Sequence, residues 1–448
     1  MTDLRPSRAT PARHRRGHGR RGPARSPATY GRAAQPLSPI DVASPTLFAG
    51  QERLQGRRFL IVTAPFGPFG RVLAEVLEAR GAEVRRMIFN AADVVDWRRG
   101  GGIAFQDEVG AWPGRVRDLA LDFTDFVVFG EGGPYNRAVL NQAEDLAANV
   151  WVLENGYFRP DWVTVERNGV NASSRLARFR EAYAAPAPAV SPTRRAGRIL
   201  PHHVVHISGY HLIQILGAGL FPRYHNHYTQ PAWRQCLGHI RRYIGLAFRP
   251  PRQCDHERLA ARGPFFIACL QREGDAQLLR YSRYADNTAF LAEVMRSFAR
   301  SAPEGARLVI KNHPLDPGLV DLPAVTRRLA ADFGLMERVD FIDGGNLAQL
   351  CRASRGMVVN NSSAALSALG FRTPVKVLGD AFFDFEGLTD QKPLDAFWAS
   401  PEAPDADLFA RFRAHVIAQA QVNGNYHEPR ALRPTAQGVA DMFERVAD

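Results

Sequence analysis

The sequence predicts an α/β fold with two Rossmann-like domains that face a cleft, a helical insertion, and helices at the C-terminus. Three observations support this prediction. Short apolar runs rich in β-branched residues alternate with segments of helical periodicity in both halves of the chain. Several runs stop abruptly at polar clusters, as parallel strands do where they deliver a ligand site. The length of 448 residues, with 45% apolar residues, is ample for two buried cores.

Charge and cysteine content narrow the function classes. Residues 1–32 contain nine Arg and one Asp and so carry +8 of the net charge of +12, which leaves little support for nucleic-acid binding by the rest of the chain. The four Cys form no CxxC pair and have no metal-like spacing with His. We expect Cys269 and Cys351, which lie in apolar runs, to be core thiols in a reducing compartment.

Residues 1–56 are rich in Arg, Pro, Ala and Ser and are predicted to be a disordered basic leader. Attraction to an anionic membrane surface is the alternative role for this segment. No apolar stretch follows the basic block His14–Arg21, so an export signal is not predicted. We expect a cytoplasmic protein.

The first Rossmann-like domain, a candidate acceptor domain, is predicted over residues 57–183. A strand over 58–63 is followed by the loop 64–70, a helix over 71–80 and a second strand over 83–89. The loop contains Gly, Pro and Phe but lacks the GxGxxG pattern. We therefore expect it to shape an acceptor pocket rather than to hold a dinucleotide.

Two further strands of this domain run into carboxylates. The strand over 125–130 is followed by Glu131, and a strand over 150–153 is followed by Glu154, with a helix over 136–148 between them. A Glu just beyond a strand can act as a general acid or base, or it can cap a loop. The pattern leaves both interpretations open for Glu154.

Residues 184–260 are predicted to form a linker and then a helical insertion. Residues 184–200 are rich in Pro, Ala and Arg; residues 204–222 contain no Asp, Glu, Lys or Arg, and an aromatic and basic stretch follows to Arg252. Polar and glycine residues within 204–222 weaken a transmembrane interpretation. We expect either a membrane-touching helical pair or a helical insertion packed on the domain. A metal at His225–His227 is disfavoured because carboxylates are not nearby.

The second Rossmann-like domain, a candidate nucleotide-phosphate-binding domain, is predicted over residues 261–400. Polar clusters at 271–277, 311–314 and 360–363 follow three of its strands, at the strand ends where such folds bind ligands. Residues 401–448 should form C-terminal helices that cross back to the first domain. The strands of the second domain are expected over 264–270, 307–311, 339–342, 357–360 and 374–378, and its helices over 286–300, 322–334 and 346–353.

The polar clusters of the second domain suit a phosphate. Ser362 and Ser363 are expected at the start of a helix, where free backbone N–H groups and two hydroxyls can hold an anion, and His313 offers a further donor. The sequence has neither a DxD motif nor a P-loop, which disfavours metal-dependent nucleotide-sugar chemistry and kinase chemistry. Carboxylates in one half and an anion site in the other describe a nucleotide-sugar glycosyltransferase of the GT-B architecture.

Four motifs resemble those of the KpsS/LipB capsule polysaccharide proteins, and they occur in the same order: Val152–Asn171, Gln271–Gln277, Lys311–Pro314 and Asn360–Ala364. The resemblance covers about residues 57–400. It implies a β-Kdo glycosyltransferase of Gram-negative bacteria, peripheral at the cytoplasmic side of the inner membrane. The implied reaction transfers Kdo from CMP-β-Kdo to a (lyso)phosphatidylglycerol acceptor and starts a poly-Kdo linker.

The same resemblance implies the partners. They are the CMP-sugar as donor substrate, an anionic phospholipid acceptor, the cytoplasmic membrane surface and other capsule synthesis or export proteins; neither a cofactor, a metal nor a nucleic acid is implied. The motifs also resemble those of bacterial GT-B sialyltransferases, in which an acidic-acidic-Gly motif supplies the base and His-Pro and Ser/Thr motifs contact the CMP phosphate. Here Glu154, Asn155 and Gly156 have Asn at the second position.

Transfer from CMP-β-Kdo to a β-linkage retains configuration, which two successive inversions achieve with one carboxylate nucleophile and one acid/base. The resemblance implies Asp275 as nucleophile and Glu154 as acid/base. The implied CMP and phosphate contacts are Lys311, His313, Pro314, Asn361, Ser362 and Ser363, and the implied sugar-carboxylate or donor contacts are Arg159, Arg272, Gln271 and Gln277.

Four alternatives stay open at this point. Asp275 can be a loop-capping residue, and Arg159 and Arg272 can form structural ion pairs. The chain can also be a transferase for another CMP-linked ulosonic acid, such as a sialic acid, or a non-catalytic capsule export or assembly component.

Overall fold

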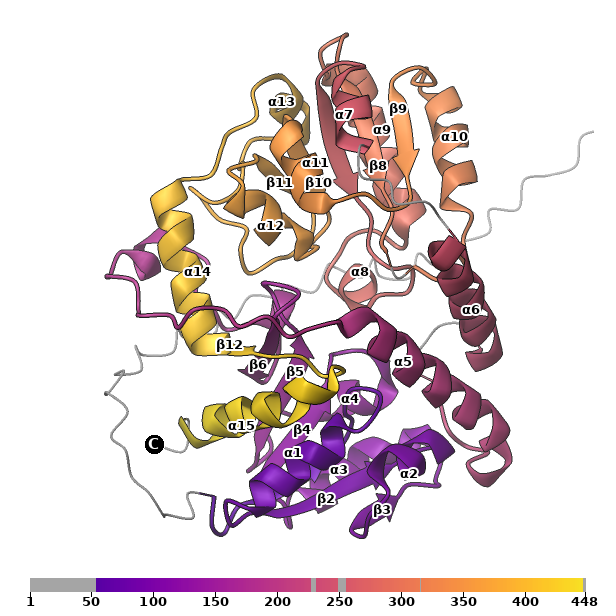
Figure 1. Cartoon of the computed structure of the whole chain (residues 1–448), viewed down its shortest axis with the longest axis vertical. Helices are drawn as coiled ribbons and strands as arrows, with labels where there is room; N and C mark the ends of the chain where they lie inside the picture. The colour runs from indigo at the N-terminus through magenta and orange to yellow at the C-terminus, as the bar shows by residue number, and fades with distance from the viewer. Residues whose placement is uncertain (1–53, 227–230, 249–254, 315, 446–448) are drawn as a thin grey trace, which may run out of the picture. The chain divides into compact units, whose positions relative to one another are not determined.

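The computed structural model describes residues 54–226, 231–248, 255–314 and 316–445, in which two largely parallel sheets are packed with helices (Figure 1). Most of the predicted leader, together with His227 and Cys254, lies outside the described residues. The described chain begins at Leu54, whose side chain is fully buried in the first core. The first core therefore includes a residue that precedes the predicted boundary at residue 57.

The first sheet has seven strands in the order β12-β6-β5-β4-β1-β2-β3. Its five strands from β3 to β5 are parallel and follow the order 3-2-1-4-5 of a Rossmann fold, whereas β6 and β12 are antiparallel additions at one edge. The strands are β1 (Arg58–Ile61), β2 (Glu83–Ile88), β3 (Gly102–Ala104), β4 (Asp125–Phe129), β5 (Asn149–Asn155), β6 (Trp162–Arg167) and β12 (Gln421–Asn423).

Both faces of the first sheet are buried, which explains the continuous apolar runs of its strands. Phe59 and Ile61 face one cluster, which α1 (Phe69–Glu78) and α15 (Pro429–Arg445) cover. Leu60 and Val62 face the other, with residues of α3 (Trp112–Leu119) and α4 (Gly133–Leu140). The helix α2 (Ala91–Trp97) begins at Asn90, whose side chain accepts hydrogen bonds from the backbone N–H groups of Ala92 and Asp93.

The second sheet has five parallel strands in the order β11-β10-β7-β8-β9, which is the same Rossmann order. Its strands are β7 (Phe265–Cys269), β8 (Arg307–Lys311), β9 (Val339–Ile342), β10 (Gly356–Val359) and β11 (Val375–Val377). Its helices are α8 (Ala276–Arg280), α9 (Asn287–Ser301), α10 (Leu322–Asp332), α11 (Leu347–Ala353), α12 (Ala364–Gly370) and α13 (Leu394–Ala399).

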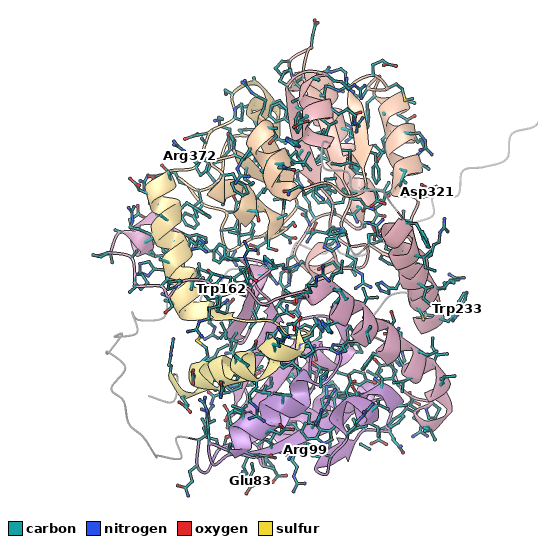
Figure 2. The ribbon with its side chains drawn as sticks, in the orientation of Figure 1. Glu83, Arg99, Trp162, Trp233, Asp321 and Arg372 are labelled. Atoms are coloured by element: carbon teal, nitrogen blue, oxygen red, sulfur yellow. The ribbon has the colours of Figure 1, made fainter. Side chains whose placement is uncertain are left out.

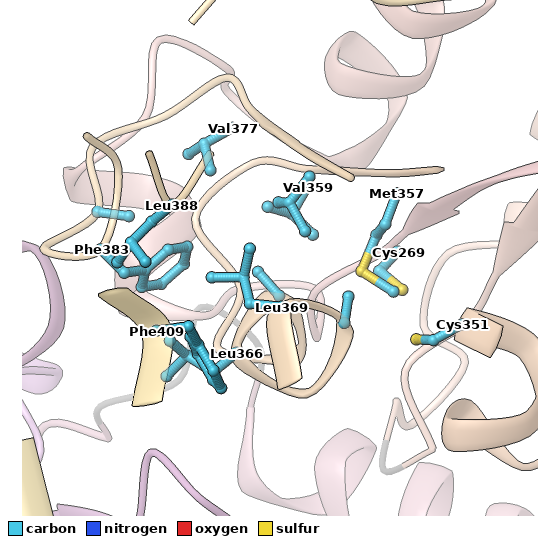
Figure 3. Close-up of a cluster of buried hydrophobic side chains, with 14 of the residues drawn as sticks. Cys269, Cys351, Met357, Val359, Leu366, Leu369, Val377, Phe383, Leu388 and Phe409 are labelled. Carbon is cyan, nitrogen blue, oxygen red and sulfur yellow. The ribbon is translucent and has the colours of Figure 1, made fainter. Parts of the chain in front are cut away.

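Figure 3 shows one core of the second sheet, to which Cys269, Cys351 and Met357 belong. Both thiols are free and buried, and burial raises the pKa of Cys269 to about 11 and that of Cys351 to about 12. The prediction of two core thiols is confirmed. Leu176 and Tyr183, which precede the predicted boundary at residue 183 or lie on it, also pack in this core.

The insertion is helical, as predicted, with α5 (Ile199–Leu216) packed against α6 (Ala232–Phe248) and followed by α7 (Asp255–Ala260). Within the described ranges, none of the helices combines the length and the apolar character needed to span a membrane. After α14 (Ala406–Ala420), the chain returns to the first sheet through β12 and α15. Phe443 of α15 stacks on Phe59 at a ring distance of 5.5 Å, so the expected crossing back is confirmed.

The predicted fold class is confirmed: the chain is α/β and GT-B-like, with two Rossmann-like sheets, a helical insertion and C-terminal helices. Two local predictions were wrong. Glu154 lies inside β5 rather than beyond a strand, because pairing with β6 extends β5 to Asn155. The helix expected over 136–148 ends at Leu140, where the side-chain amide of Gln142 donates to the Ala138 carbonyl (2.8 Å) that a continuing helix would use.

Candidate active site

Most of the predicted site residues lie at the carboxyl ends of strands beside the two switch points, where the strand order reverses. In the first sheet this point lies between β1 and β4, and in the second between β7 and β10. Ligands of open α/β sheets bind there. Residues 271–275 follow β7, residues 312–314 follow β8 and residues 360–363 follow β10, while Glu154 belongs to the end of β5.

Glu154 is a largely buried carboxylate held by its neighbour. Its Oε1 accepts hydrogen bonds from the backbone N–H (2.8 Å) and the side-chain amide (3.3 Å) of Asn155. The Asn at the second motif position therefore supports Glu154 directly. Burial raises the pKa of Glu154 to about 7, and the charges of Asp275 and Glu131 contribute to the rise, whereas Arg159 opposes it.

One glycine makes room for Glu154, and a second glycine makes room for the turn that follows it. Gly130 has a positive φ of 71°, and a Cβ there would lie 3.1 Å from Oε2 of Glu154. A Cβ on Gly156 would lie 2.0 Å from the carbonyl oxygen of Trp162, which accepts a hydrogen bond from the Gly156 N–H at 3.0 Å. The positive φ favours glycine at position 130, and the contact with the Trp162 backbone requires it at position 156.

Asp275 is the N-cap residue of α8. Its Oδ1 accepts a hydrogen bond from the backbone N–H of Gln277 at 2.8 Å. One of its two carboxylate oxygens therefore has the capping role that was left open as an alternative. Burial raises the pKa of Asp275, and the charges of Arg272 and Arg159 act to lower it. Because Asp275 also raises the pKa of Glu154, the two carboxylates are close enough to interact electrostatically.

Arg159 and Arg272 lie among the candidate catalytic groups. Arg159 acts on the pKa of Glu154, Asp275 and His313, and Arg272 acts on the pKa of Asp275 and His313. Arg159 also donates from Nε to the carbonyl of Gly156 at 3.1 Å. The structure thus gathers two carboxylates, two guanidinium groups and an imidazole from both sheets.

His313 is neutral near pH 7. Burial and the charges of Arg159, Arg272, Lys311 and Arg242 together lower its pKa to about 3. A neutral imidazole can donate one hydrogen bond to a phosphate but cannot neutralise it. The positive charge of the site comes instead from the surrounding Arg and Lys side chains.

Arg242 of α6 supports the His313-Pro314 loop, and sequence analysis did not single it out. Its Nε and Nη2 donate to the Pro314 carbonyl at 3.2 and 3.1 Å, and its Nη2 reaches the His313 carbonyl at 3.4 Å. It also forms a buried ion pair with Asp343. An Arg facing inward between apolar neighbours in a predicted helix was the signal that could have found it.

Gln277 connects the two halves. Its Nε2 donates to Oε2 of Glu131 at 3.1 Å, and its Oε1 accepts from the backbone N–H of Ala172 at 3.4 Å. Glu131 is buried and also accepts from the N–H of Val170 at 3.0 Å. Gln277, predicted as a donor contact, therefore holds the first half against the second, and Glu131 is a buried site carboxylate outside the predicted set.

The side-chain amides of Gln271 and Asn361 are hydrogen-bonded within the protein. Gln271 Nε2 donates to Oδ1 of Asn361 at 2.8 Å, and its Oε1 accepts from Asn360 at 3.0 Å. Asn361 Nδ2 donates to the carbonyls of Gln277 and Tyr281, both at 3.0 Å. This network connects the ends of β7 and β10 to α8. Both side chains therefore hold together the elements that carry the site.

Ser362, Ser363 and Lys311 lie at the ends of β10 and β8. Ser362 Oγ accepts from the N–H of Ala364 at 3.3 Å, and Ser363 is the N-cap residue of α12. Both serines are partly exposed, whereas Lys311 is buried and its charge lowers the pKa of His313. The hydroxyl groups of the two serines are thus accessible to a ligand, whereas the charged group of Lys311 is buried.

A group of histidines joins the insertion to the site, and sequence analysis missed it because its members are far apart in the chain. His427 lies 2.9 Å from His203 and 3.2 Å from His206 between ring nitrogens. His239 of α6 accepts from Arg272 at 3.2 Å and stacks on His211 of α5. Burial lowers the pKa of His203 and His211 to about 4 and of His239 and His427 to about 3.

In the parts of the chain that the structure describes, no group of three or more His, Cys, Asp or Glu side chains is arranged to hold a metal ion. The contact between His239 and Arg272 instead steadies a cation of the candidate active site from the insertion.

The loop 64–70, expected to shape an acceptor pocket, lies against α5. The ring of Phe66 is 4.6 Å from that of Tyr210, and the N–H of Gly67 donates to Asp96 at 2.8 Å. An open surface recess of about 730 Å³ lies elsewhere, between α1, β2 and residues 98–101. The described residues that line this recess do not include the predicted site residues.

The two sheets and the basic side chains at their switch points define an α/β protein suited to an anionic ligand. Residues 124–427 match the family model described as capsule polysaccharide biosynthesis protein. The chain is 32% identical to the capsule polysaccharide export protein KpsS of Escherichia coli, over 84% of this chain and 98% of that protein. It is 31% identical to the capsule polysaccharide modification protein LipB of Neisseria meningitidis serogroup A, over 82% and 91%. The chain belongs to the capsule polysaccharide biosynthesis protein family.

Solved structures are more distant. The β-Kdo 2,7 transferase of Thermosulfurimonas dismutans KpsC matches 80% of this chain and 89% of its own, with 13% identity and a TM-score of 0.37. The UDP-GlcNAc 2-epimerase of Neisseria meningitidis matches 87% and 99%, with 10% identity and a TM-score of 0.26. At these scores neither likeness decides the reaction, which has to be argued from the residues.

Proposed function

We propose that this protein is a retaining glycosyltransferase that transfers Kdo from CMP-β-Kdo to a (lyso)phosphatidylglycerol acceptor, at the cytoplasmic face of the inner membrane of a Gram-negative bacterium. Membership of the capsule polysaccharide biosynthesis family supports the biological setting. The observation that carries the chemistry is the grouping of Glu154 and Asp275, both with raised pKa values, beside Arg159, Arg272 and His313.

The proposed reaction has two steps. A carboxylate oxygen of Asp275 attacks the anomeric carbon of Kdo, the bond from this carbon to the phosphate oxygen breaks, and CMP leaves with the bonding electrons. The acceptor hydroxyl then attacks the same carbon, Glu154 takes the hydroxyl proton, and the Asp275 carboxylate is released. Two inversions leave the β configuration of the donor in the product.

The donor is proposed to bind at the second sheet. The Kdo carboxylate pairs with Arg159 and Arg272, because a guanidinium group matches a carboxylate bidentately. The departing CMP phosphate receives hydrogen bonds from His313, Ser362 and Ser363. Its charge is balanced by the cations whose fields already lower the pKa of His313.

The reaction is tested by mass spectrometry of a fluorescent, short-chain phosphatidylglycerol analogue incubated with the protein and CMP-Kdo generated in situ. One added Kdo mass is expected, and CMP-sialic acid should give none. Asp275→Asn should lose the product while keeping the N-cap, since Asn caps helices as well as Asp. Asp321→Asn, at the N-cap of α10, is the matched control and should retain activity.

Other results would replace the proposal. Transfer from CMP-sialic acid alone would assign the enzyme to another CMP-linked ulosonic acid. A folded protein that binds CMP but makes no product with either donor would contradict the proposed acceptor. A folded protein that does not bind CMP would favour a non-catalytic export or assembly component.

A further inference from the structure

Exposed apolar side chains gather on the helical insertion. Eleven of the sixteen large apolar side chains that are exposed in the described residues lie between Leu200 and Phe248, a small part of the chain. Single exposed apolar residues are normal on protein surfaces, but such a concentration indicates an interaction site. The distribution along α5 and α6 indicates what kind of site it is.

The helix α6 carries a continuous apolar stripe. Its exposed members recur at spacings of three or four residues, so they share one side of the helix: Trp233, Leu237, Ile240, Ile244 and Phe248. Phe248 is 85% exposed and Trp233 is 55% exposed. Figure 2 labels Trp233 on the outer side of α6, away from both sheets. The opposite side of α6 is buried and carries His239 and Arg242.

The helix α5 carries a second stripe. Val205, Leu212 and Leu216 follow one another at spacings of seven and four residues and are all more than half exposed. Its buried side carries Ile207 and His211, and the ring of His211 stacks on that of His239 at 6.0 Å. Both stripes therefore lie away from the contact between the two helices. We call the α6 stripe the docking face.

The charge around the docking face is of one sign. The sequence has no Asp or Glu between Glu181 and Asp255, whereas Arg occurs repeatedly in the same segment. Arg234 and Arg241 are exposed and flank the α6 stripe on one side. An apolar stripe bordered by Arg is the pattern of a helix that lies in the interface of an anionic bilayer.

We propose that the docking face rests on an anionic lipid bilayer, with its apolar side chains inserted among the acyl chains and Arg234 and Arg241 paired with lipid phosphates. The inference deepens the proposed function and rests on it for its biological sense, because it names how the enzyme reaches a lipid acceptor. The same helix carries Arg242 on its other side, against His313 and Pro314. The helix α6 would therefore contact the bilayer on one side and the His313-Pro314 loop on the other.

The test is flotation of the full chain with vesicles of phosphatidylcholine containing phosphatidylglycerol, at low salt and at about 0.5 M salt, where exposed charges are screened. Brominated lipids report insertion, because they quench a tryptophan that enters the acyl region. Leu237→Gln/Ile244→Gln should weaken salt-resistant binding about tenfold or more, since two apolar side chains leave the bilayer. Arg234→Gln/Arg241→Gln should weaken binding at low salt only.

The matched control is Leu121→Gln/Met336→Gln, which removes two apolar side chains outside the insertion that are at least as exposed, and which should bind as the unchanged chain does. Equal salt-resistant binding by the Leu237→Gln/Ile244→Gln variant would overturn the proposal. Loss of a dimer in lipid-free sedimentation, with vesicle binding unchanged, would assign the face to a second copy of the chain. Transfer to a water-soluble acceptor should persist in the variant, so failure of bilayer docking and failure of the proposed reaction give different results.

Discussion

Glu154 is the proposed acid/base of the reaction, and its pKa is near neutrality. In the proposed reaction it must be ionised to take the proton of the acceptor, and its pKa is raised to about 7. We expect the transfer rate to rise with pH up to about 7 and to level off above it. Glu154→Gln should lower the rate by about 10²- to 10⁴-fold and remove this inflection.

Initial rates of transfer between about pH 5 and pH 9 check this prediction. The folded state of each variant is verified at both ends of the range. An unchanged inflection in Glu154→Gln would assign the titration to another group. Glu166 is the first candidate, because burial raises its pKa to about 7 as well.

The same pKa shift predicts a pH dependence of stability. The pKa of Glu154 rises from 4.5 in the unfolded chain to about 7 in the folded chain. Its contribution is fully present below pH 4.5 and is lost as the pH rises through 7, because the folded chain binds the extra proton. At about 1.4 kcal/mol per pKa unit, the loss is about 3 kcal/mol at most.

Urea unfolding of the unchanged chain and of Glu154→Gln, at about pH 5 and pH 8, measures this contribution. The fall in the free energy of unfolding between the two pH values should be smaller in the variant. Glu166 contributes to both proteins and cancels in the comparison. An equal fall in both proteins would show that Glu154 is solvated in the native state.

At the residue scale, the sequence predicted the site residues that lie at strand ends. It did not predict side-chain hydrogen bonds between residues that are far apart in the chain. Glu154, Asp275 and His313 follow or end strands, and the structure places them in one electrostatic group. Whether the amides of Gln271 and Asn361 face a ligand or each other depends on a pairing ninety residues apart, which no local pattern encodes. The catalytic and binding roles of the predicted set remain predictions.

At the element scale, α6 is fixed by Arg242. Removing this side chain takes away the ion pair of the partly buried Asp343 with Arg242 and removes donors from the Pro314 carbonyl. We expect Arg242→Ala to lower the free energy of unfolding by about 3 kcal/mol and to weaken CMP binding, because the donor loop loses its support. Calorimetric titration with CMP and urea unfolding measure the two effects.

Arg241→Ala is the control for this change, since Arg241 is the exposed neighbour on the same helix. Its effect on stability should stay within about 0.5 kcal/mol. CMP affinity unchanged in Arg242→Ala would break the proposed connection between the insertion and the donor site.

Helices and strands were predicted well in the second sheet, where apolar runs alternate with segments of helical periodicity. Three strands of the first sheet were missed. The strands of the second sheet are five apolar runs between helical patterns, and all were predicted. The strand β6 and the three-residue strands β3 and β12 were not predicted, and β12 exists because α14 brings residues 421–423 beside β6. Tertiary contact, rather than local propensity, decides such strands.

At the scale of the whole molecule, α15 closes the first sheet. Phe443 is fully buried and contacts Phe59 and Trp151, at ring distances of 5.5 and 4.6 Å. Phe443→Ala should lower the free energy of unfolding by about 3–5 kcal/mol through the cavity it leaves. Gln437→Ala, at an exposed position of the same helix, should have little effect in the same urea titration.

The division into two Rossmann-like sheets followed from the alternation of strands and helices, but the contacts that join the halves did not. The hydrogen bond of Gln277 to Glu131 and the packing of Tyr183 with Phe385 connect residues more than a hundred positions apart. These contacts bring the carboxylate of β5 to the basic groups that follow β7 and β8. The site is therefore a property of the assembled molecule.

The most direct test of the account is peptide mass spectrometry of Glu154→Gln after incubation with CMP-Kdo and the phosphatidylglycerol analogue. Without its base the variant should complete the first step and stall in the second, so one Kdo mass should accumulate on the peptide that contains Asp275. The adduct should be missing from Glu154→Gln/Asp275→Asn. Product formation by Asp275→Asn, or an adduct on another residue, would contradict the proposed role of Asp275.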